Sequence, residues 1–188
     1  MTRQQHTSSP AGLTPAPELC SSASDLPEGF KMTELGPLPE EWEVVPFEDC
    51  IVGTVRVPRV KRSSYRTIGS VPVVDQGQSL IAGYVDGVTP YKDPLPVVVF
   101  GDHTRVFKFV DFPFVGGADG TQVLLPNGEL LEPLFLYYSL LNVDIPTRGY
   151  NRHFGLLREK KIPVPPLPEQ RAIAHVLRPV QRAKEATQ

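Results

Sequence analysis

The 188-residue sequence has little of several things that would narrow its class. Its two cysteines, Cys20 and Cys50, form neither a metal-binding spacing nor a disulfide framework, so we expect a reducing, cytoplasmic environment. No stretch approaches the ~18 apolar residues of a membrane span, and the N-terminus lacks the apolar run of a signal peptide. The formal net charge is only −2, so composition alone shows no strong field for nucleic acid. These absences favour a soluble protein with no membrane partner, and any nucleic-acid site must come from local clustering.

What is present suggests one folded domain between a tail and a helix. Residues 1–30 are rich in Ser, Pro, Thr and Ala and have too little to bury, so we expect a disordered tail. Residues 35–167 should form the domain, because short β-type runs broken by turns fill much of this range. Residues 168–188, after the proline-rich "PVPPLPEQ", should begin a long helix.

Two loops and one helix stand out inside the expected domain. "GDHT" (Gly101 to Thr104) lies between "PVVVF" and "RVFKFV" and is typical of a hairpin connection. "GGADG" (Gly116 to Gly120) offers positions where a positive φ costs little. After Pro133 the spacing of apolar residues becomes helical, which predicts a buried helix with one apolar face. That face contains Leu134, Phe135, Tyr138 and Leu141.

The strongest local cluster of charge is "RVPRVKRSSYR". It contains five cations and no acid, with an aromatic side chain among them. Such a cluster suits phosphate groups, and arginine can also form paired hydrogen bonds to a guanine edge. The alternative is a solvated basic loop with no ligand. The residues of interest are Arg56, Arg59, Lys61, Arg62, Tyr65 and Arg66.

A second polar loop, "TRGYNRHFGLL", precedes an apolar anchor. Tyr150, Asn151, Arg152 and His153 are residue types that contact base edges and sugar-phosphate oxygens. The alternative is a structural loop in which His153 is satisfied by a backbone carbonyl.

The sequence contains no convincing catalytic motif. Asp102 and His103 are adjacent in a hairpin and point in different directions, and no motif supplies a nucleophile. Glu159 and Lys161 have a spacing found in metal-dependent nucleases, but Asp144 is the only nearby further acid and this spacing is common. We therefore expect neither a catalytic residue nor a metal ligand in this chain.

Several stretches, in this order, resemble one protein family. They are "LPEEWEVVPFEDC", "VPVVDQGQSLIAGYVD", "PVVVFGDHTRVFKFVDFPFVGGADGTQVL" and "RGYNRHFGLLREKKIPVPPLPEQRAIAHVL". Together they are similar to one target-recognition domain of the specificity subunit of type I restriction-modification systems, followed by the start of its spacer helix. The resemblance implies a mixed α/β (α+β) globular domain that binds double-stranded DNA.

The resemblance also implies partners and roles. The subunit is not catalytic: it positions modification (methyltransferase) subunits and a restriction subunit on one half of a bipartite target. S-adenosylmethionine, ATP and Mg are then expected on the partners, with no cofactor on this chain. The expected DNA-facing side chains, by analogy, are Arg56, Arg59, Lys61, Arg62, Tyr65, Asp102, His103, Thr104, Tyr150, Arg152 and His153.

Two features depart from the family pattern. A full subunit carries two recognition domains, whereas this sequence has one and stops inside the spacer, which leaves open a half subunit with a second half as partner. Pro179 interrupts the spacer helix, where an internal proline costs ~3 kcal/mol. The apolar stripe expected to face a partner helix is Ile173, Val176, Leu177 and Val180. A truncated remnant that binds only the modification subunit is the alternative function.

Overall fold

The computed structural model describes residues 26–147, 149 and 151–185. It divides into two units, residues 1–40 and 41–188. In the first unit, β1 (Phe30–Thr33) and β2 (Gly36–Pro39) form an antiparallel hairpin. Within the described residues, the first strand starts at Phe30, five residues before the predicted domain start at residue 35. The rest of the predicted tail, residues 1–25, lies outside the described residues.

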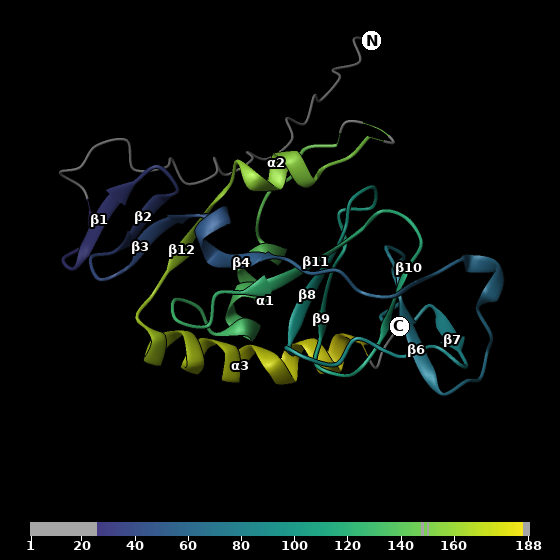
Figure 1. Ribbon diagram of the computed structural model, residues 1–188. Coiled ribbons are helices and arrows are strands. Elements are labelled where there is room, and N and C mark those ends of the chain that lie inside the picture. Colours follow the sequence, from purple (N-terminus) through teal and green to yellow (C-terminus); the bar gives the residue numbers. More distant parts are fainter. Residues whose placement is uncertain (1–25, 148, 150, 186–188) are drawn as a thin grey trace, which may run out of the picture. The chain divides into compact units, whose positions relative to one another are not determined.

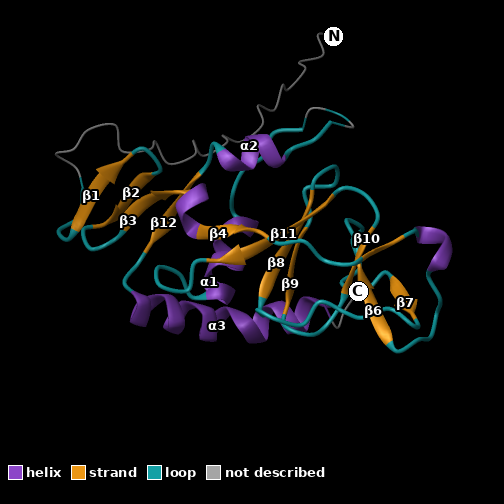
Figure 2. Cartoon of the chain, viewed as in Figure 1, coloured by secondary structure: helices purple, strands orange, loops and turns teal. Residues whose placement is uncertain are grey.

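The second unit contains two four-stranded sheets (Figures 1 and 2). In one, β10 pairs in parallel with both β5 and β6, and β6 pairs antiparallel with β7. The other is entirely antiparallel, in the order β4-β11-β8-β9. The first sheet contains β5 (Arg59–Val60), β6 (Val71–Val74), β7 (Gly83–Val85) and β10 (Val115–Gly117). The second contains β4 (Ile51–Thr54), β8 (Val97–Gly101), β9 (Phe107–Val110) and β11 (Thr121–Pro126).

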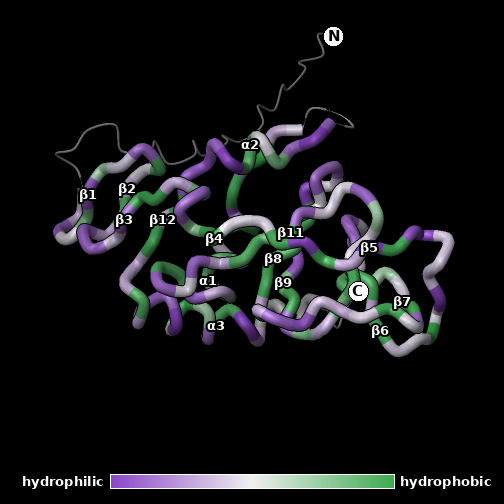
Figure 3. Tube along the Cα trace, in the orientation of Figure 1, coloured by the Kyte–Doolittle hydropathy of each residue, from purple (hydrophilic) through white to green (hydrophobic). Residues whose placement is uncertain are grey.

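Strand β8 lies at the centre of the fold, and its composition explains why. Every residue of "VVVFG" is buried, because successive side chains of a strand point to opposite faces and both faces are covered here. Val98 and Phe100 join the core that includes the helices. Val97 and Val99 join a second apolar cluster with Val57, Val74, Val110, Phe114 and Val123, and these residues come from both sheets. Figure 3 shows the apolar character concentrated along β8 and β12.

Helix α1 (Pro133–Leu141) forms where the helical spacing predicted it. Pro133 occupies its first turn, and the Glu132 side chain accepts a hydrogen bond from Phe135 N at 2.6 Å. The helix is buried as predicted, but its buried face is wider. Leu136 and Leu140 are fully buried, whereas Leu141 is 45% exposed. The shorter helices are η2 (Phe47–Cys50), η3 (Arg62–Ser64) and α2 (Phe154–Arg158).

The start and the end of the β-rich part are joined by a pair of strands. β3 (Glu43–Pro46) pairs antiparallel with β12 (Lys161–Val164). Beyond this pair, Trp42 Nε1 donates a hydrogen bond to Glu169 Oε2 at 3.1 Å, although the two residues are 127 apart in the chain. We call this arrangement of β3, β12, Trp42 and Glu169 the terminal clamp.

Helix α3 (Leu167–Glu185) is attached through Gln170 to the segment that precedes α1. Gln170 is fully buried. Its Nε2 donates to the carbonyl oxygens of Pro165 at 2.7 Å and Leu130 at 3.0 Å, and its Oε1 accepts from Glu132 N at 2.9 Å. A buried amide with all these bonds fixes the direction in which α3 leaves the domain.

The stripe predicted for a partner helix is divided between two environments. Ile173 packs against the domain's own core next to buried Ala174, because the first turns of α3 lie on α1. Ile173 is therefore only partly accessible, and its contact with a partner helix stays a prediction. Val176 is 67% exposed and Leu177 is 36% exposed, so these two are available to a partner. The side chain of Val180 lies outside the described residues. The helix continues through Pro179, and no helix in the described part is long and apolar enough to cross a membrane.

Candidate functional site

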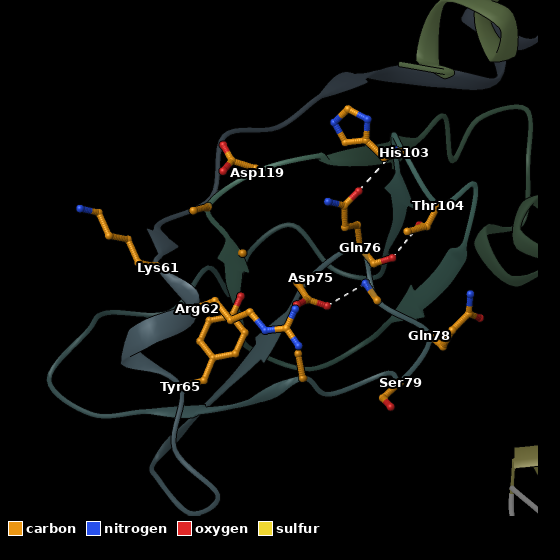
Figure 4. A pocket seen from close by; sticks show the side chains of 14 residues that line it. Lys61, Arg62, Tyr65, Asp75, Gln76, Gln78, Ser79, His103, Thr104 and Asp119 are labelled. Carbon is orange, nitrogen blue, oxygen red and sulfur yellow. Dashed lines mark hydrogen bonds between the residues drawn. The ribbon is translucent and has the colours of Figure 1, made fainter. Parts of the chain in front are cut away.

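Four loops meet around one pocket of about 1000 Å³. They are the η3 segment with Lys61, Arg62 and Tyr65, the turn 75–79 after β6, the β8–β9 hairpin with His103 and Thr104, and the turn 117–119 before β11. Figure 4 shows Lys61, Arg62 and Tyr65 on one side of the pocket and Gln76, His103 and Thr104 on the other. The structure thus brings together part of the basic segment and the "DHT" loop, which are far apart in the sequence. We call this site the loop pocket.

The cationic side of the loop pocket is exposed. Lys61 precedes η3 and Arg62 is its first residue, and this segment contains no acidic residue. Asp75 and Asp119 contribute the opposite sign to the pocket wall. Asp75 contacts the buried ammonium of Lys108, as described below, whereas Lys61 and Arg62 are exposed and can attract an anion from outside.

Gln76 connects the turn after β6 to the hairpin. Its Oε1 accepts a hydrogen bond from His103 N at 3.3 Å, and its backbone oxygen accepts one from Thr104 Oγ1 at 2.6 Å. Gly101 and Gly120 make room for these contacts, because a Cβ on Gly120 would lie 2.5 Å from Gln76 Oε1. Both glycines therefore belong to the packing of the pocket wall.

Asp75 fixes the base of the same turn. Its Oδ1 accepts from Gly77 N at 2.8 Å, and Lys108 Nζ lies 2.6 Å from its backbone oxygen and 3.7 Å from its carboxylate. Lys108 is only 4% exposed. Burial lowers the pKa of the Lys108 ammonium, and the Asp75 carboxylate opposes that shift. Burial, together with Asp75, raises the pKa of Tyr65. The contacts of the buried Lys108 with the partly buried Asp75 hold the pocket wall in one geometry.

The cations of the basic segment have different roles. Arg59 donates to the carbonyl oxygens of Thr121 at 2.8 Å and Ala118 at 3.2 Å, so its guanidinium ties β5 to the turn before β11. Arg66 forms an ion pair with Asp86 at 3.2 Å. Arg56 is exposed. Of this segment, Lys61, Arg62 and Tyr65 line the loop pocket, and Arg56 and Arg59 do not.

Asp102 and His153 are buried, contrary to the prediction that they face DNA. Asp102 is 2% exposed and His153 is 1% exposed. Asp102 Oδ1 accepts from His153 N and Phe154 N, both at 2.8 Å, and His153 Nδ1 lies 2.9 Å from the Asp102 backbone oxygen. The alternative for His153, a structural loop in which the ring pairs with a carbonyl, is the correct one. We call this pair the hairpin anchor, because it fastens the β8–β9 loop to the start of α2.

The other residues of the second polar loop are placed less fully. Arg152 is exposed and does not line the loop pocket. Tyr150 lies outside the described residues. A DNA contact by Arg152 therefore stays a prediction.

The residues of the two catalytic spacings lie in different elements. Asp102 Oδ1 accepts hydrogen bonds from two backbone N–H groups at the start of α2. Glu159 follows α2 and Lys161 begins β12, while Asp144 is exposed in a separate loop. Within the part of the chain that the structure describes, no group of three or more His, Cys, Asp or Glu side chains could hold a metal ion.

Sequence reasoning missed Asp75, Gln76 and Lys108. A signal for the first was present, because Asp-x-Gly directly after an apolar strand favours a turn closed by the aspartate side chain. Lys108 appears in "FKFV" as an ordinary polar position of an alternating strand. Its burial depends on the turn after β6, which local sequence does not reveal.

Comparisons with known proteins agree on one family. The model of the type I restriction modification DNA specificity domain matches residues 39–188. A putative type I restriction enzyme MjaX specificity subunit from Methanocaldococcus jannaschii is 26% identical over 178 aligned residues, covering 80% of this chain and 42% of the relative. The EcoR124I/EcoR124II specificity subunit from Escherichia coli is 26% identical over 113 residues, covering 56% of this chain and 28% of the relative. The chain thus spans about two-fifths or less of these relatives.

Solved structures support the same fold. The S subunit of a type I restriction-modification system from M. genitalium superposes with a TM-score of 0.59 at 18% identity, covering 75% of this chain and 39% of that one. A chain from a structure describing complex assembly and conformational transition of the type I R-M system gives 0.55 at 23% identity, covering 80% and 41%. The predicted mixed α/β fold of a recognition domain is confirmed.

Proposed function

Because this chain belongs to the family of type I restriction modification DNA specificity domains, we propose that it binds double-stranded DNA through the loop pocket and reads one half of a bipartite target. The observation that carries this proposal is the convergence of cationic and neutral polar side chains from separate loops. Lys61 and Arg62 supply charge for phosphates, and Gln76, His103 and Thr104 supply groups that hydrogen-bond base edges.

The proposed activity is positioning rather than catalysis. Specificity subunits are named as components of type I restriction enzymes among the relatives. We therefore expect partner subunits to carry adenine methylation and DNA cleavage, together with S-adenosylmethionine, ATP and Mg. The exposed Val176 and Leu177 of α3 suit contact with a modification subunit or with the helix of a second half.

An interaction module that does not read DNA is the second candidate. It would use the same exposed apolar pair on α3, which lies outside the loop pocket. The two functions predict different partners for the isolated chain: the first requires DNA, the second only the modification subunit.

The deciding experiment measures affinity for mixed-sequence duplex DNA as salt is raised. If the pocket cations neutralise phosphates, the logarithm of the association constant should fall linearly with the logarithm of salt concentration, by about 0.9 per neutralised phosphate. The chain alone and the chain with a modification subunit are measured in parallel. Absence of DNA binding at low salt in both samples contradicts the proposal. Capture of the modification subunit without DNA retention supports the second candidate.

A further inference from the structure

We propose that Gln76 is a specificity-determining residue whose amide Nε2 donates to the acceptor edge of a base entering the loop pocket. This inference rests on the proposed function and deepens it. Gln76 lines the pocket and lies outside both the basic cluster and the second polar loop. Its neighbours hold it in a single orientation.

The orientation of the amide follows from its partner. His103 N can only donate, so the atom that faces it at 3.3 Å is Oε1. The amide is planar, so Nε2 lies on the other side of it. Figure 4 shows this nitrogen on the side of Gln76 away from the hydrogen bond to His103. The side chain therefore presents two N–H donors from the pocket wall.

The side chain is fixed before any ligand arrives. Thr104 Oγ1 donates to the Gln76 backbone oxygen at 2.6 Å, which holds the main chain. A Cβ on Gly120 would lie 2.5 Å from Oε1 and 2.7 Å from Nε2, so the amide rests directly on the glycine backbone. Gly120 has a φ of +67°, a conformation that glycine adopts without strain. A preset donor loses little side-chain freedom on binding, which favours selective recognition.

Lys108 and Asp75 act as positioning residues beneath Gln76. Lys108 Nζ contacts the backbone oxygen of Asp75 at 2.6 Å, and the Asp75 carboxylate closes the turn onto Gly77 N at 2.8 Å. Gln76 therefore lies between Asp75, which the buried Lys108 contacts, and Gly77, which the Asp75 carboxylate holds. These positioning residues set where the amide lies, whereas Lys61 and Arg62 set how strongly phosphates are attracted.

The chemistry of a donor predicts which bases are accepted. In the major groove, purines present N7, guanine also O6, and thymine O4 as acceptors, whereas cytosine presents only the N4 amino donor. A fixed N–H donor therefore favours adenine, guanine or thymine and rejects cytosine at one position of the target.

The test is selection of bound sequences from a randomised duplex library by the full chain. Wild type should enrich sequences that exclude cytosine at one position. Gln76→Ala should lose that preference, with a fall of about tenfold in the ratio of selected to random DNA affinity, the size of one good base contact. Gln76→Glu, which replaces the donor by an acceptor, should enrich bases that present an amino donor at the same position.

Two further variants separate recognition from general damage. Gln122→Ala removes the same amide from β11, outside the loop pocket, and should leave the selected sequence unchanged. Lys108→Met should weaken the preference at the Gln76 position while the salt dependence of binding stays that of wild type. Circular dichroism and thermal unfolding confirm that each variant is folded, and if Lys108→Met is not, the two Gln76 variants suffice.

The outcomes distinguish this inference from the proposed function. If wild type enriches a sequence and Gln76→Ala enriches the same one with an affinity ratio within about twofold, the inference is overturned and the proposed function stands. If wild type binds no DNA or enriches nothing, the proposed function fails, and the role of Gln76 fails with it.

Discussion

The rim of the loop pocket and the hairpin anchor are both built from polar or charged side chains, but these side chains have opposite roles. At the anchor, Asp102 and His153 are almost completely buried and their polar groups are directed at each other and at α2. At the rim, Lys61 and Arg62 are exposed beside η3. Buried polar groups hold structure because leaving them unpaired is costly, whereas exposed charges add little to stability and are free for a ligand. Hydrogen-bond partners, rather than residue type, separate the two.

The largest expected effect is at the anchor. Asp102→Ala should lower the free energy of unfolding by about 3 kcal/mol, because it removes two hydrogen bonds to a carboxylate. Phe154 N–H loses its acceptor, and His153 N–H keeps only the Asp102 backbone oxygen. Urea unfolding followed by circular dichroism measures the change.

Two controls sharpen this result. Asp102→Asn keeps one acceptor oxygen and should lose less stability than the alanine variant. Asp111→Ala removes an exposed carboxylate near the same hairpin and should change stability by no more than about 0.5 kcal/mol. Equal losses for Asp102→Ala and Asp111→Ala would contradict the structural role of the anchor.

The rim should show the opposite pattern. The double variant Lys61→Ala/Arg62→Ala should have a free energy of unfolding within about 0.5 kcal/mol of the wild-type value. Its DNA affinity at low salt should fall roughly 10- to 100-fold, and the salt slope should become shallower by about 0.9 for each phosphate that is no longer neutralised. Lys92→Ala, an exposed lysine outside the loop pocket, is the matched control. An unchanged salt slope in the double variant would remove these two cations from the interface.

The smallest expected effect concerns Tyr65, whose hydroxyl connects the rim of the loop pocket to Asp75 in its wall. Tyr65→Phe removes the hydroxyl that interacts with Asp75 and should cost about 1 kcal/mol at neutral pH. Because burial and Asp75 raise the pKa of Tyr65 above its ordinary 10.0, the folded state holds this proton longer than the unfolded state. The contribution is complete below pH 10 and is lost as pH rises through the raised pKa.

The stability difference between wild type and Tyr65→Phe should therefore shrink above pH 10. Denaturant unfolding of both proteins across this range measures it, and comparing the two removes the effect of other titrating groups. Tyr84→Phe, at a half-buried tyrosine of β7, is the control. A difference that stays constant with pH would show that the hydroxyl does not sense Asp75.

Local patterns predicted much of the fold. The apolar runs around Val71, Val97 and Phe107 form strands, "GDHT" is a hairpin loop, and Pro133 begins a buried helix. These features depend on turn chemistry and on side-chain spacing, which are written in neighbouring residues. The gathering of Lys61 with His103 was not predicted, because it depends on how the two sheets pack.

The errors have a common physical origin. Asp102 looked like an exposed loop residue, yet it is buried because α2 offers two N–H groups that need an acceptor. Ile173 looked like part of a partner stripe, yet it packs partly against the domain's own core. In each case a segment distant in sequence decides the environment. Gln76 was missed for the same reason, since its role depends on His103 and Gly120 rather than on its own neighbours.

The terminal clamp has a consequence for the order of folding. Its members are as much as 127 residues apart, so their pairing carries a large loop-closure entropy, whereas the β8–β9 hairpin closes over a few residues. We expect the hairpin to form early and the clamp late. Variants that weaken the clamp, such as Trp42→Phe, should then accelerate unfolding while leaving the refolding rate almost unchanged.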